Sequence, residues 1–497
     1  MKKILFALLF LSAAELPAQQ CNCDSNFVWL KRYMERNYPG YKPKVNDSTR
    51  AAFYSYTQKY EELIKKVDNP NYCEYYILKW LQFFKDGHIQ LIDNNKNRNL
   101  TLTSKDEKNK KLIRKLNEGV ETIPIDSIEF VKSLDTMKHK GIQGVYAINT
   151  SINNSEYYVA IVKNNNGFRD YAGVILSSKT KFWHKGEVKL ELRQISDSAF
   201  DVMLYQQNHS IWIYDQPFKI LKNGDLDAAP YWKRIIPPPV SGSPVTTTTD
   251  ENEITHCNAN ACFTNLNTQT SYLRIHSFSD MFTNEIDSVV KANMNSIKSH
   301  KYMIIDLRYN GGGSDDSYTA LLPIIYSNPV VSYGVDLYST PGNILAIKKA
   351  EKEDAYLSAE DRKFFDSLTA VMNAHPYQYI IQAPDDTVTS DSIMPEPEKV
   401  VVLMNRGCGS TTEQFLLFAH DCKKVTLMGE HSAGVLDYSN IRPVDFPCPY
   451  LTLWYPTTRS HRIPIGKGID GIGIAPKIKL APDADWIKAA EEYLEKN

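Results

Sequence analysis

The stretch Lys399–Gly434, KVVVLMNRGCGSTTEQFLLFAHDCKKVTLMGEHSAG, places a serine where a strand is expected to turn into a helix. The aliphatic run Val400–Met404 predicts a buried strand, and apolar residues on one face predict a helix over Thr411–His420. Ser410 then lies at a helix N-terminus, where free N–H groups and the helix dipole favour negative charge. The same position suits an ordinary N-cap, because Glu413 completes a capping box. This stretch alone leaves both interpretations open.

Three further turns carry polar residues or glycines where strands or helices should end. They are Tyr302–Ser314 (YMIIDLRYNGGGS), Phe84–Leu91 (FKDGHIQL) and Gly466–Pro476 (GKGIDGIGIAP). The first contains three consecutive glycines, whose backbone amides can approach a reacting group closely. The second turn comes after an expected helix and contains His88. The third contains one acid, Asp470.

A serine hydroxyl is a weak nucleophile at neutral pH unless a neighbouring base takes its proton, and histidine has a suitable pKa. The chain has 11 histidines. His88 is the preferred candidate because it lies on a glycine-containing turn. His420 and His431, which are close to Ser410 in sequence, are the alternatives.

Together these motifs resemble the tricorn-like branch of the C-terminal processing peptidase (tail-specific protease) family of serine peptidases. The D-G-H turn, the D-L-R-x-N-G-G-G strand end and a serine three residues before a glutamate appear in the family's order. A G-E-x-x-x-G turn at Gly429–Gly434 and a final G-I-x-P segment follow them. The resemblance covers 26–91 and roughly 271 to the C-terminus, and it implies Ser410 as the nucleophile.

The resemblance also indicates which base is used. Family members with a serine–lysine dyad carry the lysine at the place where this chain has Val435. A histidine base, His88, is therefore implied. The family's orienting glutamate corresponds to Asp470, which is one methylene shorter, and a serine of the tricorn protease corresponds to Gly87. If Asp470 does not hold the histidine, Asp86 and then Glu413 are the next candidates.

These observations predict an exported serine peptidase that hydrolyses peptide or protein substrates. Ser410 would attack the carbonyl, His88 would act as base and then acid, and Asp470 would orient His88. Backbone N–H groups of Gly312 and Thr411 would form the oxyanion hole. No cofactor is implied. The alternatives are an inactive peptide-binding module and a serine esterase, although the G-x-S-x-G elbow is absent around Ser410.

Length and charge restrict the possible classes of protein. A chain of 497 residues should contain two to four domains, and 42% hydrophobic residues suffice for ordinary cores. A net charge of −1 gives no reason to expect nucleic-acid binding. The sequence does not indicate an oligomeric state.

The first twenty residues, MKKILFALLFLSAAELPAQQ, have the pattern of a secretory signal: Lys2–Lys3, an apolar run over Ile4–Ala14 and a small residue, Ala18. The apolar run is too short for a membrane span. Cys21 raises the possibility of a lipoprotein, but the preceding glutamines do not fit lipid attachment. We therefore expect a soluble periplasmic or extracellular protein.

Eight cysteines in an exported chain allow a few disulfides. Cys257 and Cys262, which flank a short turn, form the most plausible local pair. The cysteine and histidine spacings do not fit a zinc site, and no metal is expected.

The pattern along the chain predicts an α/β multidomain protein. A signal peptide (1–20) precedes a helical region (21–100) and a β-rich domain of unknown type (101–236), a candidate substrate gate. A linker rich in proline and threonine (237–253) leads to an α/β peptidase core (254–497) built from alternating strands and helices. A charged helical insertion at about 342–395 interrupts this core, and a solvated helical pair is favoured there over a lid.

Overall fold

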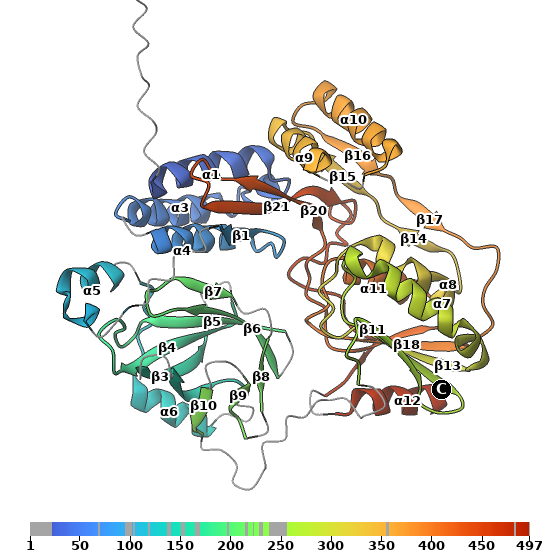
Figure 1. Cartoon of the computed structure of the whole chain (residues 1–497), viewed down its shortest axis with the longest axis horizontal. Coiled ribbons are helices and arrows are strands. Elements are labelled where there is room, and N and C mark those ends of the chain that lie inside the picture. The colour runs from blue at the N-terminus through green and yellow to red at the C-terminus, as the bar shows by residue number, and fades with distance from the viewer. Residues whose placement is uncertain are drawn as a thin grey trace, which may run out of the picture.

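The computed structural model describes residues 22–496 except 68–69, 95–101, 103–104, 118–119, 137–140, 151–154, 165–168, 196–197, 214–216, 222, 228–231, 238–255, 354–356 and 482–483. The expected signal peptide and all but the first residue of the expected linker lie outside the described residues. Figure 1 shows the N-terminal helices above a β-rich domain, with the C-terminal half of the chain beside both.

The N-terminal region is helical and closes with a short strand. Its elements are α1 (Cys23–Asn37), α2 (Tyr41–Lys44), α3 (Arg50–Ile64), α4 (Pro70–Leu81), the 3-10 turn η1 (Gln82–Phe84) and β1 (Gln90–Asp93). Asn22 caps α1, because its side chain accepts a hydrogen bond from the Ser25 N–H at 2.8 Å. Aromatic side chains, including Phe27, Trp80 and Phe84, fill the space between the helices and are almost fully buried.

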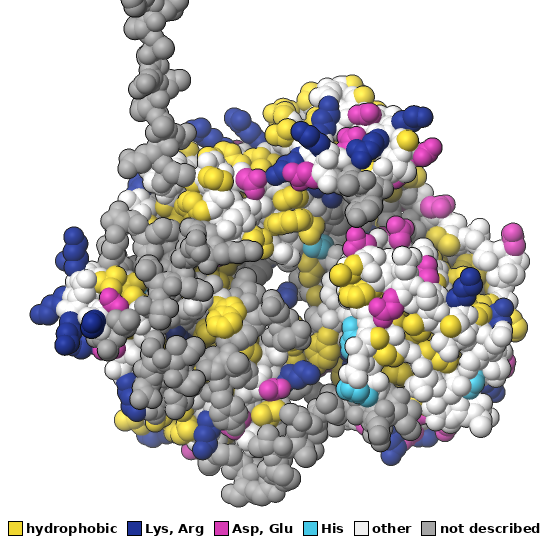
Figure 2. Space-filling view, in the orientation of Figure 1, with side chains coloured by type: hydrophobic (Ala, Val, Ile, Leu, Met, Phe, Trp, Pro, Cys, Tyr) yellow, Lys and Arg dark blue, Asp and Glu magenta, His cyan; other side chains and the backbone are white. Residues whose placement is uncertain are grey.

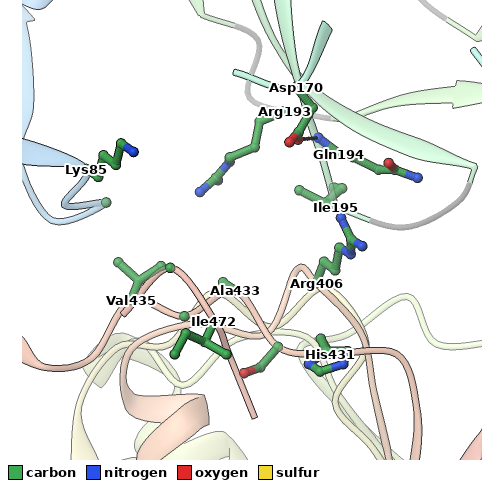
Figure 3. A pocket seen from close by; sticks show the side chains of 14 residues that line it. Lys85, Asp170, Arg193, Gln194, Ile195, Arg406, His431, Ala433, Val435 and Ile472 are labelled. Carbon is green, nitrogen blue, oxygen red and sulfur yellow. Dashed lines mark hydrogen bonds between the residues drawn. The ribbon is translucent and has the colours of Figure 1, made fainter. Parts of the chain in front are cut away.

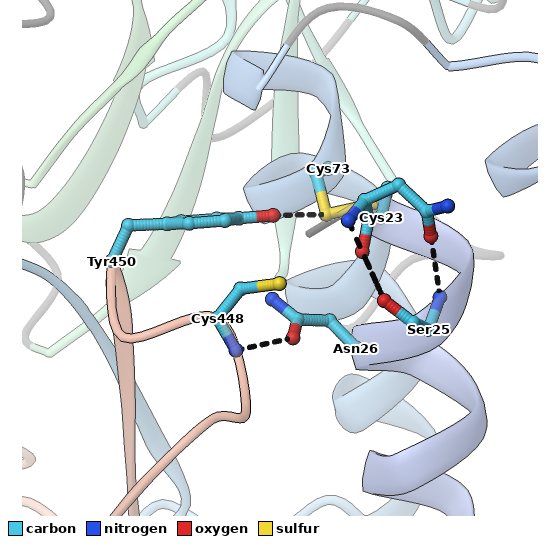
Figure 4. The surroundings of a disulfide bond; sticks show 7 residues. Cys23, Ser25, Asn26, Cys73, Cys448 and Tyr450 are labelled. Carbon is cyan, nitrogen blue, oxygen red and sulfur yellow. Dashed lines mark hydrogen bonds between the residues drawn. A yellow bond between two sulfur atoms is a disulfide. The ribbon is translucent and has the colours of Figure 1, made fainter. Parts of the chain in front are cut away.

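A disulfide between Cys23 and Cys73 joins α1 to α4 (Figure 4). Beside it, the Tyr450 hydroxyl donates to Cys73 Sγ at 3.3 Å, and the Cys448 N–H donates to Asn26 Oδ1 at 3.1 Å. A segment near the C-terminus is therefore held against the first helix.

The β-rich domain is a strongly curved antiparallel sheet. After 3-10 turn η2 (Asp106–Lys108) and helices α5 (Lys110–Asn117) and α6 (Ser127–Thr136), its strands are β2 (Gly144–Thr150), β3 (Ser155–Lys163), β4 (Tyr171–Ser178), β5 (Val188–Gln194), β6 (Ala199–Tyr205), β7 (Ile211–Ile213), β8 (Phe218–Ile220), β9 (Leu226–Asp227) and β10 (Trp232–Ile236). In the described part of the chain their order is β5-β4-β3-β2-β10-β9-β8-β6-β7. Because β5 also pairs with β6, the sheet closes into a barrel.

The core sheet is mostly parallel and is covered by helices on both faces. Its strand order is β11 (Ala261–Asn265), β12 (Thr270–Ile275), β13 (Tyr302–Asp306), β18 (Lys399–Met404), β19 (Val425–Gly429) and β22 (Ile478–Lys479). The associated helices are η3 (Asp280–Phe282), α7 (Thr283–Ser299), η4 (Asp315–Leu321), α8 (Leu322–Ile325), α11 (Thr411–Asp421) and α12 (Trp486–Lys496). The predicted α/β class is confirmed.

Alternate strand residues of this sheet pack into two cores. Met303 and Val402 lie in the core with α7 and α11, whereas Ile304 and Val401 lie in the core with α12. Since β12, β13, β18 and β19 are parallel, the turns that follow β13, β18 and β19 meet at one edge of the sheet.

A third sheet joins the N-terminal region to the C-terminal half of the chain. It consists of β1, β15 (Val335–Tyr338), β16 (Tyr379–Ala383), β20 (Tyr438–Asp445) and β21 (Leu451–Ser460), with β1 paired to β21. Helices α9 (Pro341–Glu353) and α10 (Ala359–Ala374) pack on it as a pair, and β14 (Val330–Ser332) pairs with β17 (Asp386–Val388). The β1–β21 pairing brings the segment just before β1, which contains His88, to the core.

Candidate active site

Ser410 lies at the N-terminus of α11, directly after the turn that follows β18. Its backbone has a positive φ of 54°, which is uncommon for a residue other than glycine. The Ser410 N–H donates to the Val435 carbonyl and to Glu413 Oε2, at 3.2 Å in each case. The hydrogen bond from the Ser410 N–H to Glu413 that the expected capping box requires is therefore present. The Ser410 side-chain oxygen makes a separate contact.

His88 lies against that oxygen. Its Nε2 is 3.0 Å from Ser410 Oγ, and its Nδ1 is 2.5 Å from the Tyr438 carbonyl oxygen. A carbonyl oxygen can only accept a hydrogen bond, so Nδ1 carries the proton and Nε2 is free to accept the Ser410 proton. The side chain is buried, at 8% exposure. The structure thus brings together two residues that are 322 positions apart in sequence.

Gly87, which precedes the histidine, is closely approached by Val435. A Cβ at this position would lie 2.5 Å from Val435 Cγ1, so any other residue would require the Val435 side chain to shift. Val435 is the residue that stands where serine–lysine members of the family carry their base. The two departures from the family pattern are therefore in direct contact.

Asp470 does not occupy the expected position beside the histidine ring. Its Oδ1 accepts hydrogen bonds from the N–H groups of Leu436 (2.9 Å) and Asp437 (2.8 Å). In return, Asp437 Oδ2 accepts from the N–H groups of Ile469 (2.5 Å) and Asp470 (2.8 Å). The short aspartate side chain is engaged by backbone donors, and the partner of the ring is the Tyr438 carbonyl. Among the described contacts, Asp470 is connected to His88 only through the segment that carries this carbonyl.

Burial and the neighbouring carboxylates Asp86 and Asp437 raise the pKa of Asp470 to about 7.

Asp86, the first alternative for an orienting acid, accepts hydrogen bonds that hold the turn around His88. Its Oδ1 accepts from the His88 N–H at 2.9 Å, and its Oδ2 accepts from the Tyr38 hydroxyl at 2.6 Å. It contacts the backbone of His88 and supports the ring only indirectly.

Glu413, the other alternative, is fully buried and bound to four donors. Besides the Ser410 N–H, these are Ser432 Oγ (2.5 Å) and the N–H groups of Gly434 (2.7 Å) and Val435 (2.8 Å). Burial raises the pKa of this carboxyl, and its hydrogen bonds lower it in part. Glu413 fastens the G-E-x-x-x-G turn to the serine helix.

The glycine turn after β13 lies against the nucleophile, as expected for an oxyanion hole. A Cβ on Gly312, whose φ is +105°, would lie 2.9 Å from both Ser410 Cβ and Thr411 N. However, the Gly312 N–H donates to Asn310 Oδ1 at 3.1 Å, so this amide is already used. Among the described residues, the N–H groups of Thr411, Gly311 and Gly313 have no acceptor. The structure therefore favours Gly311 or Gly313, in place of Gly312, as the donor opposite Thr411.

The remaining candidates lie away from the serine oxygen. His420 is exposed at the end of α11 and lies 2.8 Å from Asp421, and His431 lines a neighbouring pocket. Burial raises the pKa of Cys408 to about 12, so its thiol is not ionised at neutral pH. In the part of the chain that the structure describes, no cluster of side chains could hold a metal ion.

Sequence reasoning missed the Tyr438 carbonyl and the paired role of Asp437. A backbone carbonyl leaves no signature in side-chain identity, and Tyr438 belongs to no motif. The only available signal was the close sequence spacing between the G-E-x-x-x-G turn and the following strand.

Comparison with protein families gives a match over the core of the chain. Residues 269–480 match the model of peptidase family S41. No curated protein matches the chain. Among solved structures, mature CPAF is similar over 96% of this chain and 96% of its own, at 12% identity and a TM-score of 0.48.

Two other solved structures are similar at lower scores. The similarity to the photosystem II D1 C-terminal processing protease spans 95% of this chain and 97% of that protein, at 13% identity and a TM-score of 0.39. The similarity to the tricorn protease spans 95% of this chain but 37% of that protein, at 11% identity and a TM-score of 0.39. At 11–13% identity, these likenesses concern the fold alone. Residues 269–480 thus match peptidase family S41, the family of C-terminal processing serine peptidases.

Proposed function

We propose that the protein hydrolyses peptide bonds with Ser410 as nucleophile and His88 as its base, the tricorn-like plan of the family. The observation that carries this proposal is the 3.0 Å contact between Ser410 Oγ and His88 Nε2, with Nδ1 held by the Tyr438 carbonyl. Nucleophile, base and orienting group are thus in the order that serine hydrolysis requires. Val435 in place of lysine excludes a lysine base at that position.

The chemistry proceeds in two halves. His88 Nε2 takes the Ser410 proton as Oγ attacks the substrate carbonyl, and the resulting oxyanion is stabilised by the Thr411 N–H and an amide of the glycine turn. The imidazolium then gives its proton to the leaving amine, and an acyl-enzyme remains on Ser410. Water, activated by the same ring, releases the acid and restores the enzyme.

Export is part of this proposal. Disulfides join Cys23 to Cys73 and, as expected from sequence, Cys257 to Cys262. Disulfides persist in oxidising compartments outside the cytoplasm. They support the interpretation of residues 1–20 as a secretory signal. Over the residues that the structure describes, no helix is long and apolar enough to cross a membrane.

A fluorophosphonate probe tests the nucleophile. We expect labelling of the wild type, loss of labelling in Ser410→Ala, and peptide turnover reduced by about 10⁴-fold or more in Ser410→Ala and His88→Ala. Ser439→Ala is the matched control, because this serine lies nearby on β20 and bonds only to Thr458 among the contacts described. Absence of labelling in a folded wild type would contradict the proposal and favour an inactive peptide-binding protein.

Peptide digestion distinguishes the remaining alternatives. Cleavage products identified by mass spectrometry separate internal cleavage from removal of a carboxyl-terminal segment. Hydrolysis of simple esters without any peptide cleavage would instead indicate an esterase.

A further inference from the structure

A cavity of about 530 Å³ lies between the β-barrel and the peptidase core. One wall is formed by the end of β5 and the start of β4, and the opposite wall by the G-E-x-x-x-G turn and the glycine-rich segment near Asp470. Figure 2 shows the molecule hollowed between these two parts, with Lys or Arg side chains at the hollow. The barrel therefore contributes directly to a site in the core.

The cavity adjoins the catalytic pair. Gly87, the neighbour of His88, lines it together with Val435, whose carbonyl accepts the Ser410 N–H. A substrate residue held in the cavity would lie within a few residues of the bond that Ser410 attacks.

Three cations from three separate elements converge on this space. Lys85 comes from the end of η1, Arg193 from β5 and Arg406 from the turn after β18 (Figure 3). Among the described residues, neither Lys85 nor Arg406 has an acidic partner. Arg193 lies 3.3 Å from Asp201, and its buried Nε has no acceptor in the described part of the chain.

The one acid in the lining is already engaged. Asp170 Oδ2 accepts a hydrogen bond from the Gln194 N–H at 2.7 Å. The lining also has an effect on His431: burial, with the positive charges of Lys479 and Arg406, lowers the pKa of this ring. With three cations and one acid, the lining has an excess of positive charge.

Like charges that lie close together repel one another, which costs free energy. In a cluster that serves only structure, acidic partners would offset this cost. Here the lining offers one acid to three cations. Clefts lined by charge of one sign concentrate ligands of the opposite sign. Apolar groups are present as well, since Ile195, Val435 and Ile472 line the cavity and Ile472 is 71% exposed. A peptide that carries a carboxylate beside apolar atoms fits this combination.

We propose that this cavity binds a carboxylate of the peptide substrate and makes the enzyme selective for anionic peptides. The proposal rests on the proposed peptidase function of Ser410 and His88, and it gives the β-barrel a role as one wall of a specificity site. The carboxylate is that of an acidic side chain near the scissile bond, and the free end of the peptide is the competing outcome of the test.

The test compares fluorogenic peptides that differ only in charge. One series replaces each Asp or Glu by Asn or Gln, and a second compares a free carboxyl terminus with its amide. The measured quantity is the ratio of kcat/KM for the charged peptide to that for its neutral match. We expect a ratio of roughly ten to a hundred for the wild type, in line with charged hydrogen bonds, and a fall toward one in Lys85→Gln/Arg406→Gln.

Two control variants accompany this double variant. Lys85→Arg/Arg406→Lys keeps the charges and should restore the ratio, which a purely structural role of these residues would not produce. Lys488→Gln removes an exposed charge on α12, outside the cavity lining, and should leave the ratio unchanged. Raising the salt concentration should lower the wild-type ratio, because screening weakens charge recognition.

The two peptide series identify the source of the carboxylate. Selectivity that survives amidation of the terminus supports an acidic side chain in the cavity, and selectivity lost on amidation overturns that assignment. A wild-type ratio near one in both series, or an undiminished ratio in the Lys85→Gln/Arg406→Gln variant, would overturn the proposal.

Binding of the same peptides to Ser410→Ala, followed by fluorescence anisotropy, separates this proposal from the proposed function. Charge-selective binding by a protein without wild-type turnover would retain the cavity assignment and reject the peptidase mechanism. Turnover without charge selectivity would retain the peptidase mechanism and reject the cavity assignment.

Discussion

The role of Asp470 can be decided by comparing Asp470→Asn with Asp470→Ala. In the structure, Oδ1 of this residue accepts two backbone N–H groups, at 2.8 and 2.9 Å, and does not contact the His88 ring. An asparagine amide oxygen can accept the same two hydrogen bonds. Alanine cannot, so it frees the segment that carries the Tyr438 carbonyl.

The magnitudes follow from these contacts. We expect Asp470→Asn to lower kcat less than about tenfold. Asp470→Ala leaves two donors unsatisfied, which costs about 2 kcal/mol when water reaches them in part. The displaced carbonyl then misplaces His88, and an error of this kind reduces kcat by roughly a hundredfold.

The assay is steady-state hydrolysis of one peptide by both variants, with the melting temperature measured in parallel. A fall of 10³ to 10⁴ in Asp470→Asn, with an unchanged fold, would refute the indirect role. It would show that the negative charge acts on the histidine, as in a serine protease whose orienting aspartate is lost.

The pH dependence of stability provides a second readout of the same residue. Because the pKa of Asp470 is raised to about 7 from an ordinary value of 3.8, the folded protein favours the protonated carboxyl. That contribution to stability is complete below about pH 4 and is lost as the pH rises through about 7. Asp470→Asn cannot ionise, so its melting temperature relative to the wild type should increase between pH 4 and pH 8. A constant difference would contradict the raised pKa.

Two further predictions concern the scaffold around Ser410. Gly312→Ala should lower kcat at least a hundredfold and reduce the melting temperature, because its Cβ would lie 2.7 Å from the Gly409 carbonyl at a φ of +105°. Gly311→Ala, which has no atom within 4 Å of its Cβ, should keep the wild-type melting temperature, and equal melting temperatures for both variants would contradict this. Glu413→Gln should lower the free energy of unfolding by roughly 2–4 kcal/mol in urea denaturation, because two N–H groups lose their acceptor to an NH₂ group. A change below about 0.5 kcal/mol would show that these hydrogen bonds are replaced by water.

Local patterns predicted the core well because they coincide with its packing. The run Val400–Met404 alternates between the two buried faces of the sheet, and the glycine turn after β13 needs backbone conformations that few residues adopt. The contact between His88 and Ser410 was also accessible, since glycine-containing turns and the order of the motifs marked both residues. A serine at a helix N-terminus would otherwise have been explained as a cap.

Other parts of the site depend on which atoms meet, and residue type does not determine this. The family position of Asp470 suggested a side chain that holds the histidine. In the structure its Oδ1 instead accepts hydrogen bonds from the backbone N–H groups of Leu436 and Asp437. Likewise, Asn310 competes for the Gly312 amide, which no turn pattern reveals. The cationic cavity was invisible because Lys85, Arg193 and Arg406 are far apart in sequence and belong to different layers.

The pairing of β1 with β21 has a consequence for when the enzyme can act. The histidine is made early in translation and the serine late, and Tyr438 and the β21 strand that hold His88 in place come later still. A nascent chain therefore contains the histidine turn before the serine helix has been made, and His88 gains its contact with Tyr438 only after both. The proposed pair of Ser410 and His88 is complete only in a chain that includes β21, so we expect chains truncated before this strand to lack turnover.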